Sequence, residues 1–351
     1  MIKPRLQYRF AVFLCLVLGL AVFLWIRPFS KSGDWVWTGQ TMGSSYTIKL
    51  SHRPLLKEEF HQLKKDIHAM LDELNRSFSL YDRDSEINHF NQLKKTDYVK
   101  VSEPFFSAVS QAIAFSKETD GYLDVTVSPL VTLWGFGPDG FSKIPEDDEI
   151  RQALMATGTD KISVQKNDQS IRKVIPEVEI DLNSIAQGFA ADRIAACLLK
   201  KNCMNFMVDV GGEFICRGKN SKNEWWKIGI ETPEPSLFSG EKVAAVVELA
   251  NKSLSTSGSY RRFIEKNQKT FSHILNPKSG KPVQGNLVSV TVIAETAASA
   301  DAYATALFVM GQEKAWQWLK KQNYVEACMI STKQDGTFSI QMTDGFRERE
   351  I

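Results

Sequence analysis

Residues 297–311, AASADAYATALFVMG, form a run of small and apolar residues that one carboxylate, Asp301, interrupts. This composition is typical of a helix that is buried on all sides. A buried carboxylate is costly unless it is hydrogen-bonded, ion-paired or bound to a metal. The segment therefore predicts a buried helix in which Asp301 has a polar partner.

Two further oxygen donors accompany Asp301. Thr305 follows four positions later and shares its helix face, and a loosened turn would offer the carbonyl of Ala304. These are hard ligands without a nearby Cys or His, so they suit Mg2+ better than zinc or copper. The alternative is an aspartate that caps or hydrogen-bonds to a neighbouring element, and this segment alone leaves both open.

The composition is that of a globular protein. The chain has 351 residues, of which 43% are hydrophobic and 24% charged, enough for one large core or two smaller ones. The net charge is +2, and no Lys/Arg run with interleaved aromatic residues occurs. This balance argues against nucleic acid as the principal partner.

The N-terminus differs from the rest of the chain. Lys3, Arg5 and Arg9 precede an uncharged apolar run, residues 10–26, which no small-residue cleavage site follows. The length is at the short end for a membrane-spanning helix, and the basic residues favour a cytoplasmic N-terminus. We expect an uncleaved transmembrane anchor over residues 1–29 and an exported domain over residues 30–351.

Four cysteines lie outside the predicted anchor, and an exported protein can pair them in three ways. Their spacing fits no zinc motif, and free buried thiols remain the alternative. The sequence leaves the choice open for Cys197, Cys203, Cys216 and Cys328.

Periodicity predicts helices and strands in an irregular order, without the alternation of a doubly wound sheet. This order indicates an α+β fold. The expected helices are 57–78, 102–121, 146–155 and 184–200, and the expected strands lie at 206–210, 225–230, 243–249, 288–294 and 325–330 and within 35–50 around the turn 41–43.

Residues 180–192 place polar side chains where a strand meets a helix. Asp181 ends the strand, and Ser184 and Gln187 follow in the first helical turn. Backbone N–H groups at a helix N-terminus favour phosphate, and a hydroxyl there can complete a metal shell. Ordinary capping by Asp181 or Asn183 is the alternative.

Five other stretches have two interpretations each. Gly211-Gly212 and residues 255–261 are small and flexible enough for a ligand to approach the backbone, or are simply turns. His273 is a candidate general base or a structural histidine. The aromatic residues in 121–126 and 133–138 line a pocket for a planar ring or belong to the core.

In their order along the chain and in their residues, these segments together resemble the ApbE family of FAD:protein FMN transferases. The resemblance covers nearly all of the expected exported domain. The matching segments are 41–43, Tyr81, 119–121, 124–131, 133–138, 181–192, 210–212, 255–260, 272–273, 287–294 and 300–311.

The resemblance implies an ApbE-like fold of mixed, mainly antiparallel sheets with packed helices. It also implies an exported, Mg2+-dependent enzyme that splits FAD, releases AMP and attaches FMN by a phosphoester bond to Thr or Ser of a target protein. The implied acceptors are subunits of the sodium-translocating NADH:quinone reductase, of Rnf-type complexes and of related flavoproteins. With the predicted anchor, this places the catalytic domain in the periplasm, at the bacterial inner membrane.

Site residues follow from the resemblance by position. His273 is the implied base. The implied metal ligands are Ser184, Asp301, Ala304 and Thr305. The implied FAD contacts are Met42, Tyr81, Tyr122, Leu123, Asp124, Asp181, Gln187 and Leu275.

Two departures from the family pattern stand out. Many members are anchored by a lipidated cysteine, whereas this chain has a predicted transmembrane anchor. Some relatives carry acidic residues at the positions of Gln187 and Ala304, where this chain offers only an amide and a backbone carbonyl. Two rival functions remain: an FAD pyrophosphatase that yields FMN and AMP, and a non-catalytic exported FAD-binding protein.

Overall fold

The computed structural model describes residues 34–53, 55–138, 140–141, 143–231, 243–258, 263–266, 269–347 and 349–351. The predicted anchor, residues 1–29, lies outside these residues. In the described part of the chain, no helix is long and apolar enough to cross a membrane.

A large sheet organises the domain, and each pair of neighbouring strands in it is antiparallel. Strands far apart in sequence are neighbours, so the order of the sheet depends on long-range pairing. From one edge to the other the strands are β1 (Trp35–Thr41), β2 (Ser44–Leu50), β6 (Phe206–Val210), β7 (Glu213–Arg217), β10 (Ser253–Gly258), β15 (Leu287–Ala294), β16 (Glu326–Thr332) and β17 (Phe338–Met342).

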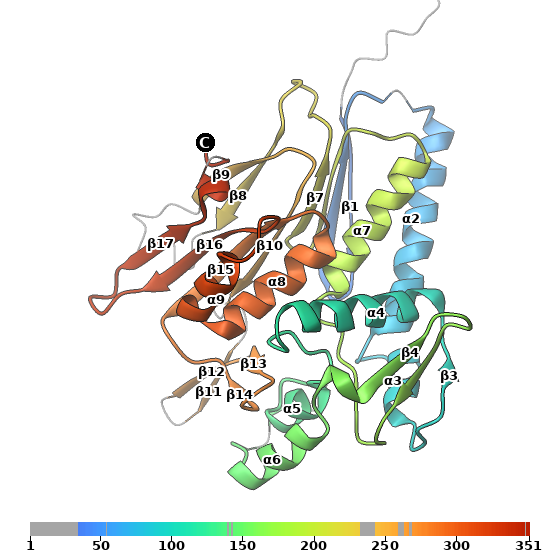
Figure 1. Ribbon diagram of the computed structural model, residues 1–351. Coiled ribbons are helices and arrows are strands. Elements are labelled where there is room, and N and C mark those ends of the chain that lie inside the picture. The colour runs from blue at the N-terminus through green and yellow to red at the C-terminus, as the bar shows by residue number, and fades with distance from the viewer. Residues whose placement is uncertain are drawn as a thin grey trace, which may run out of the picture. The chain divides into compact units, whose positions relative to one another are not determined.

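The two faces of the sheet have different covers (Figure 1). Helices α2 (Lys57–Phe78), α7 (Ala186–Lys200) and α8 (Ala297–Met310) pack on one face, and hairpin β8–β9 (Trp226–Glu231, Val243–Leu249) packs on the other. Because side chains alternate along a strand, consecutive residues enter different cores. Ile215 lies in the core beneath the helices and Cys216 in the core beneath the hairpin.

The predicted buried helix is the innermost one. Every residue of α8 except Thr305 is buried, as the small and apolar composition predicts. Thr296 caps its N-terminus, where the hydroxyl oxygen accepts a hydrogen bond from the Ser299 amide at 3.2 Å.

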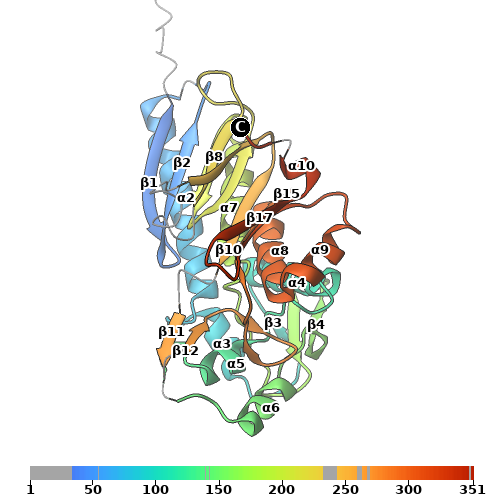
Figure 2. The same ribbon diagram turned by 90° about the vertical axis from the view of Figure 1, so that its left-hand side faces the viewer.

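A second group of elements lies below the large sheet in both views (Figures 1 and 2). Part of this group, residues 128–155 and 271–275, has a small core of its own, in which Trp134 packs on Phe271 and donates from Nε1 to the Gly280 carbonyl at 2.8 Å. The rest of the group, with Ile87 and Phe105, packs into the core beneath the helices. Of the two interpretations of residues 133–138, Trp134 fits the core. The elements are α3 (Glu86–Gln92), α4 (Glu103–Glu118), α5 (Ser128–Leu133), α6 (Asp147–Met155), the sheet β3–β5–β4 (Val99–Lys100, Ser170–Lys173, Ile162–Gln165) and the hairpins β11–β12 (Phe263–Lys266, Lys269–Ser272) and β13–β14 (Leu275–Asn276, Lys281–Pro282).

The α+β class and the main elements predicted from the sequence are confirmed. The helix expected at 184–200 begins two residues later, and residues 255–258, expected as a flexible stretch, belong to strand β10. The four cysteines are free thiols in this structure. Elements that the sequence did not predict include β7, β10, β17, α3, α5, the short helix at Thr159–Lys161, α9 (Gln312–Leu319) and α10 (Asp344–Arg347).

Helices α7 and α8 touch backbone to backbone at Gly188. A Cβ atom on Gly188 would lie 2.4 Å from the Ala297 carbonyl oxygen and 2.8 Å from the Ala298 Cα. Real Cβ contacts are essentially never this short, so only glycine permits this approach.

We predict that Gly188→Ala destabilises the domain by about 1–3 kcal/mol, because the added methyl group forces the two helices apart. Urea unfolding measures the change. The control is Gly229→Ala, an exposed site on β8 where the nearest atom to a new Cβ is Val243 Cγ1 at 3.4 Å. Equal stability of the two variants would contradict the packing argument.

Candidate active site

Two turns and the end of a strand meet at one end of the large sheet. The register Tyr46↔Val210 places the turn after β1 beside the turn after β6, and Gly211 donates from its amide to the Ser45 carbonyl at 3.0 Å. Strand β10 ends on the same side, since Leu254 pairs with Phe214 and the strand continues beyond the start of β7. The predicted segments 41–43, 211–212 and 255–258 therefore converge at this end.

Met42 is held in the turn between β1 and β2. Its φ angle is 49°, in the left-handed region, and its amide donates to Asn75 Oδ1 on α2 at 3.1 Å. Asn75 Nδ2 donates in turn to Thr41 Oγ1 at 3.1 Å. These contacts fix a strained turn at the sheet end, as is common at functional sites.

Asp301 has a polar partner, as predicted. The side chain is 6% exposed, and Oδ2 accepts a hydrogen bond from the Gly188 amide at 3.2 Å. Burial raises the pKa of this carboxyl well above its usual range, and the negative charge of Glu213 raises it further. The Gly188 hydrogen bond opposes this rise only in part.

Thr305 faces the end of strand β10. Its Oγ1 lies 3.1 Å from Ser257 Oγ, so α8 and β10 present two hydroxyl groups to the same place. Ala304 is fully buried, within the continuous helix Ala297–Met310. The loosened turn that would offer its carbonyl is not observed.

Gln187 lies against the glycine turn. A Cβ atom on Gly211, whose φ angle is +67°, would lie 2.5 Å from Gln187 Nε2. Ser184 is half-buried, two residues before α7 begins. The start of α7 and the turn 211–212 thus flank the face of α8 that carries Asp301 and Thr305.

Two of the predicted FAD contacts are buried carboxylates that hold local turns. Asp181 is 5% exposed, and its Oδ1 accepts from the Asn183 amide at 2.8 Å. Asp124 accepts from the amides of Thr126 at 2.8 Å and Thr159 at 3.1 Å. Burial raises the pKa of both carboxyls. A hydrogen bond from the Asp181 amide to the Val125 carbonyl, at 2.7 Å, joins the two segments.

Tyr122 lies between two lysines. Lys314 Nζ donates to its hydroxyl oxygen at 3.0 Å, and Lys278 Nζ is 4.2 Å from the ring centroid. Lys278 also pairs with Asp120 at 2.9 Å. The predicted contact Tyr122 is therefore part of a basic surface next to β13.

The other predicted residues have different surroundings. Leu123 and Leu275 are in hydrophobic cores, 1% and 6% exposed, whereas Tyr81 is 69% exposed. His273 is half-buried between β12 and β13. The contacts described above bring together Asp301, Thr305, Gln187 and the turns at the sheet end.

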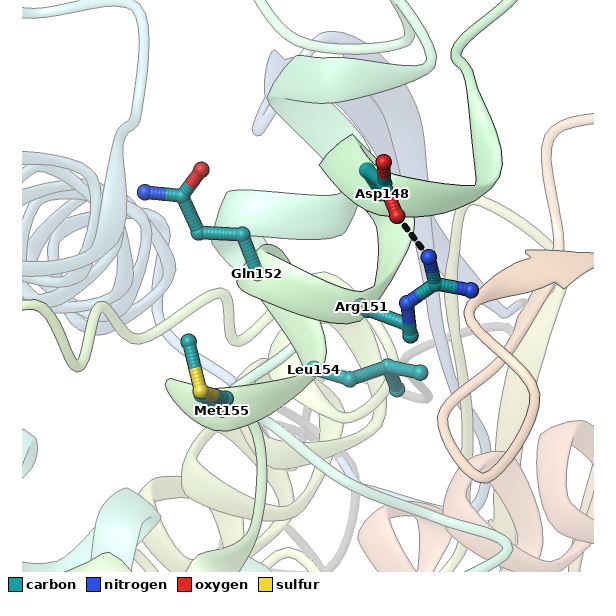
Figure 3. Close-up of a pocket in the computed structure, with 5 residues that line it drawn as sticks. All are labelled: Asp148, Arg151, Gln152, Leu154 and Met155. Carbon is teal, nitrogen blue, oxygen red and sulfur yellow. Dashed lines mark ion pairs between the residues drawn. The ribbon is translucent and has the colours of Figure 1, made fainter.

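Two surface depressions elsewhere contain none of the predicted residues. One of about 690 Å³ on α6 is lined by Leu154, Met155 and Gln152, with an ion pair between Asp148 and Arg151 (Figure 3). A second of about 680 Å³ lies beside Gln312 and β16. In the described part of the chain, no group of three or more His, Cys, Asp or Glu residues is placed to hold a metal.

The model of the ApbE family matches residues 42–329, most of the chain. The chain belongs to the ApbE family. This membership confirms the resemblance drawn from the sequence and the prediction that the chain is an enzyme.

Similar proteins span nearly the same length. The FAD:protein FMN transferase of Haemophilus influenzae is 37% identical over 316 residues, 89% of this chain and 90% of that protein. The one from Escherichia coli is 34% identical over 312 residues, 88% and 87%. The solved flavin transferase ApbE from Vibrio cholerae superposes with a TM-score of 0.80 at 33% identity, covering 90% of this chain and 99% of that one. The apo flavinyl transferase ApbE from Pseudomonas stutzeri gives a TM-score of 0.80 at 31% identity, covering 90% and 96%.

Sequence reasoning missed several residues at the site. Gly188 and Asp192 lie within the predicted segment 180–192, but their role depends on contact with α8. Asp192 accepts from the Ala297 and Ala298 amides, at 2.8 and 2.9 Å. Glu213 directly follows the Gly-Gly turn. Its place next to that predicted segment was the sequence signal that could have identified it as a site residue.

We predict that the stability of the wild type falls relative to Asp192→Asn as pH rises from 4 to 7. Burial raises the pKa of Asp192 to about 6 despite its bonds to the α8 amides. Between about pH 4 and 6 the unfolded chain has released this proton while the folded wild type still holds it, so the free energy of unfolding falls as pH rises. The fall ends near pH 6, where the folded carboxyl also ionises. We expect a relative loss of about 2 kcal/mol, measured by urea unfolding across this range. A pH-independent difference between the two proteins would contradict it.

Proposed function

We propose that the chain is a Mg2+-dependent FAD:protein FMN transferase. It cleaves FAD, releases AMP and joins FMN by a phosphoester bond to Thr or Ser of a target flavoprotein. The observation that supports this most is the meeting of Asp301 and Thr305 with the turns at the sheet end, in a chain that belongs to the ApbE family.

The donor set at the sheet end fits a hard divalent cation. Asp301 and Thr305 supply oxygen atoms from one helix face, with the Ser257 hydroxyl beside them and Ser184 at the start of α7. Asp301 is buried, and no Lys or Arg of the described residues forms a salt bridge with it, so a cation there offsets the cost of its charge. A bound Mg2+ supplies charge neutralisation on the pyrophosphate and stabilises AMP as the leaving group.

The protein's own groups orient the reactants. Gln187, beside the turn at Gly211, is placed to hydrogen-bond with FAD where the backbone can be approached closely. Tyr122 and its two lysines present a flat ring and positive charge to the same substrate. His273 accepts the proton of the acceptor hydroxyl as that oxygen attacks the phosphorus of the FMN half. Transfer of this kind chiefly needs positioning and charge stabilisation.

The acceptor and the location are part of the same proposal. Residues 1–29 anchor the chain in the bacterial inner membrane, with residues 30–351 in the periplasm. The acceptors are exposed Thr or Ser residues of flavoprotein subunits, such as those of sodium-translocating NADH:quinone reductase or Rnf-type complexes. Recovery of the protein from membranes with residues 1–26 still attached supports the anchor, and a soluble mature form refutes it.

The direct test incubates the chain with FAD, Mg2+ and a Thr-bearing acceptor domain, and follows AMP release and acceptor mass together. We expect one AMP per FMN adduct on the acceptor. AMP with only free FMN would instead indicate a pyrophosphatase. FAD binding without AMP release under any metal condition would indicate a non-catalytic flavin-binding protein.

We predict that Asp301→Ala abolishes Mg2+-dependent turnover and leaves the fold intact, because the lost carboxylate holds the cation and its buried charge is costly to the fold. The assay is AMP release, with thermal unfolding as the check on folding. Asp335→Ala, at an exposed turn, is the matched control and should retain wild-type turnover. Full activity of Asp301→Ala would rule out the metal assignment.

We predict that His273→Ala slows FMN transfer about 10²–10⁴-fold and changes FAD affinity much less. A general base acts on the acceptor hydroxyl and contributes little to binding of the flavin substrate. Single-turnover transfer and fluorescence titration with FAD separate the two effects. The control is His89→Ala, at an exposed residue of α3. An equal loss of both would remove His273 as the base.

A further inference from the structure

We infer that Glu213 and Ser255 belong to the metal site, where the Glu213 carboxylate and the Ser255 hydroxyl join Asp301 in binding a divalent cation, directly or through water. This inference deepens the proposed function and rests on it. Neither residue is among the ligands that the family resemblance implies. The inference comes from strand register, side-chain direction and burial.

Strand register puts the two residues side by side. Leu254 pairs with Phe214, and the next step along this antiparallel pair brings Ser255 opposite Glu213. Glu213 is the first residue of β7, directly after the Gly-Gly turn. Both residues therefore lie at the end of the sheet where the candidate site is found.

Side-chain direction puts both residues on the helix face of the sheet. Glu213 shares its face of β7 with Ile215, which packs in the core beneath the helices. Ser255 shares its face of β10 with Ser257, whose hydroxyl lies 3.1 Å from Thr305 on α8. Glu213 and Ser255 thus point toward the helix that carries Asp301.

The buried hydroxyl of Ser255 indicates that a ligand binds here. Ser255 is 1% exposed, and its Oγ makes no hydrogen bond with any described residue. A buried hydroxyl without a partner costs about 1–3 kcal/mol, so such a group usually serves a ligand. The unpartnered Ser255 hydroxyl therefore points to a ligand independently of the two buried carboxylates, Glu213 and Asp301.

Charge indicates which ligand. Glu213 is 7% exposed, and its charge acts on buried Asp301. Two like charges in a buried site repel each other, and a divalent cation between them turns this repulsion into attraction. The ligand set implied by the resemblance holds one carboxylate, and Glu213 supplies the second. Mg2+ is usually bound by one or two carboxylates together with substrate phosphates.

The test measures Mn2+ binding by calorimetry, with the full-length chain in detergent, both without and with FAD. Glu213→Gln should lower Mn2+ affinity at least about tenfold, and Ser255→Ala should lower it by a smaller factor. Asp209→Asn is the matched control. Asp209 lies in β6 just before the same turn, on the opposite face of the sheet, and accepts from the Gly212 amide. Its affinity should stay within about twofold of wild type.

A second readout separates ligation from a structural role. With EDTA present, both variants should unfold at the wild-type temperature or above, since each loses an unfavourable buried group; a structural role would lower this temperature. Should Glu213→Gln not fold, Ser255→Ala decides alone. Wild-type Mn2+ affinity in both variants, or no Mn2+ binding by the wild type, would overturn the inference. Lower Mn2+ affinity in variants of a chain that transfers no FMN would leave the inference standing and remove the proposed function.

Discussion

The backbone contact between α7 and α8 at Gly188 is the constraint on which the site depends. With no side chain between the helices, the Gly188 amide reaches Asp301 and the Asp192 carboxylate reaches the first amides of α8. The same contact brings the start of α7, with Gln187, to the turn at Gly211. A chain that could not bring these helices together would leave Asp301 without its hydrogen bond.

Electrostatics supports the proposal that this tightly packed region is a metal site and not only a core. Asp301 and Glu213 are both buried, and the charge of Glu213 disfavours ionisation of Asp301. Among the described residues, one hydrogen bond to the Asp301 carboxylate is present, and the Gly188 amide donates it. Such an arrangement lowers stability unless a cation binds, which is common where function and stability conflict.

Much of the fold could be predicted because local patterns specify it. The apolar spacing in 57–78 and the composition of 297–311 gave α2 and α8, and a lone carboxylate among alanines identified Asp301. The roles proposed for Glu213 and Ser255 could not be predicted, because they depend on pairing between strands about forty residues apart. Strand β10 could not be predicted from the polar run at 255–258 for the same reason, because its partners β7 and β15 lie far away in sequence.

The central claim is that a divalent cation binds at the end of the sheet, held by Asp301. Anomalous diffraction from crystals of the chain grown with Mn2+ and FAD tests it most directly. The account predicts a Mn2+ peak within coordination distance of the Asp301 carboxylate, about 2.0–2.3 Å, on the side that faces β7 and β10. A strongest peak elsewhere on the protein, or none, would contradict it.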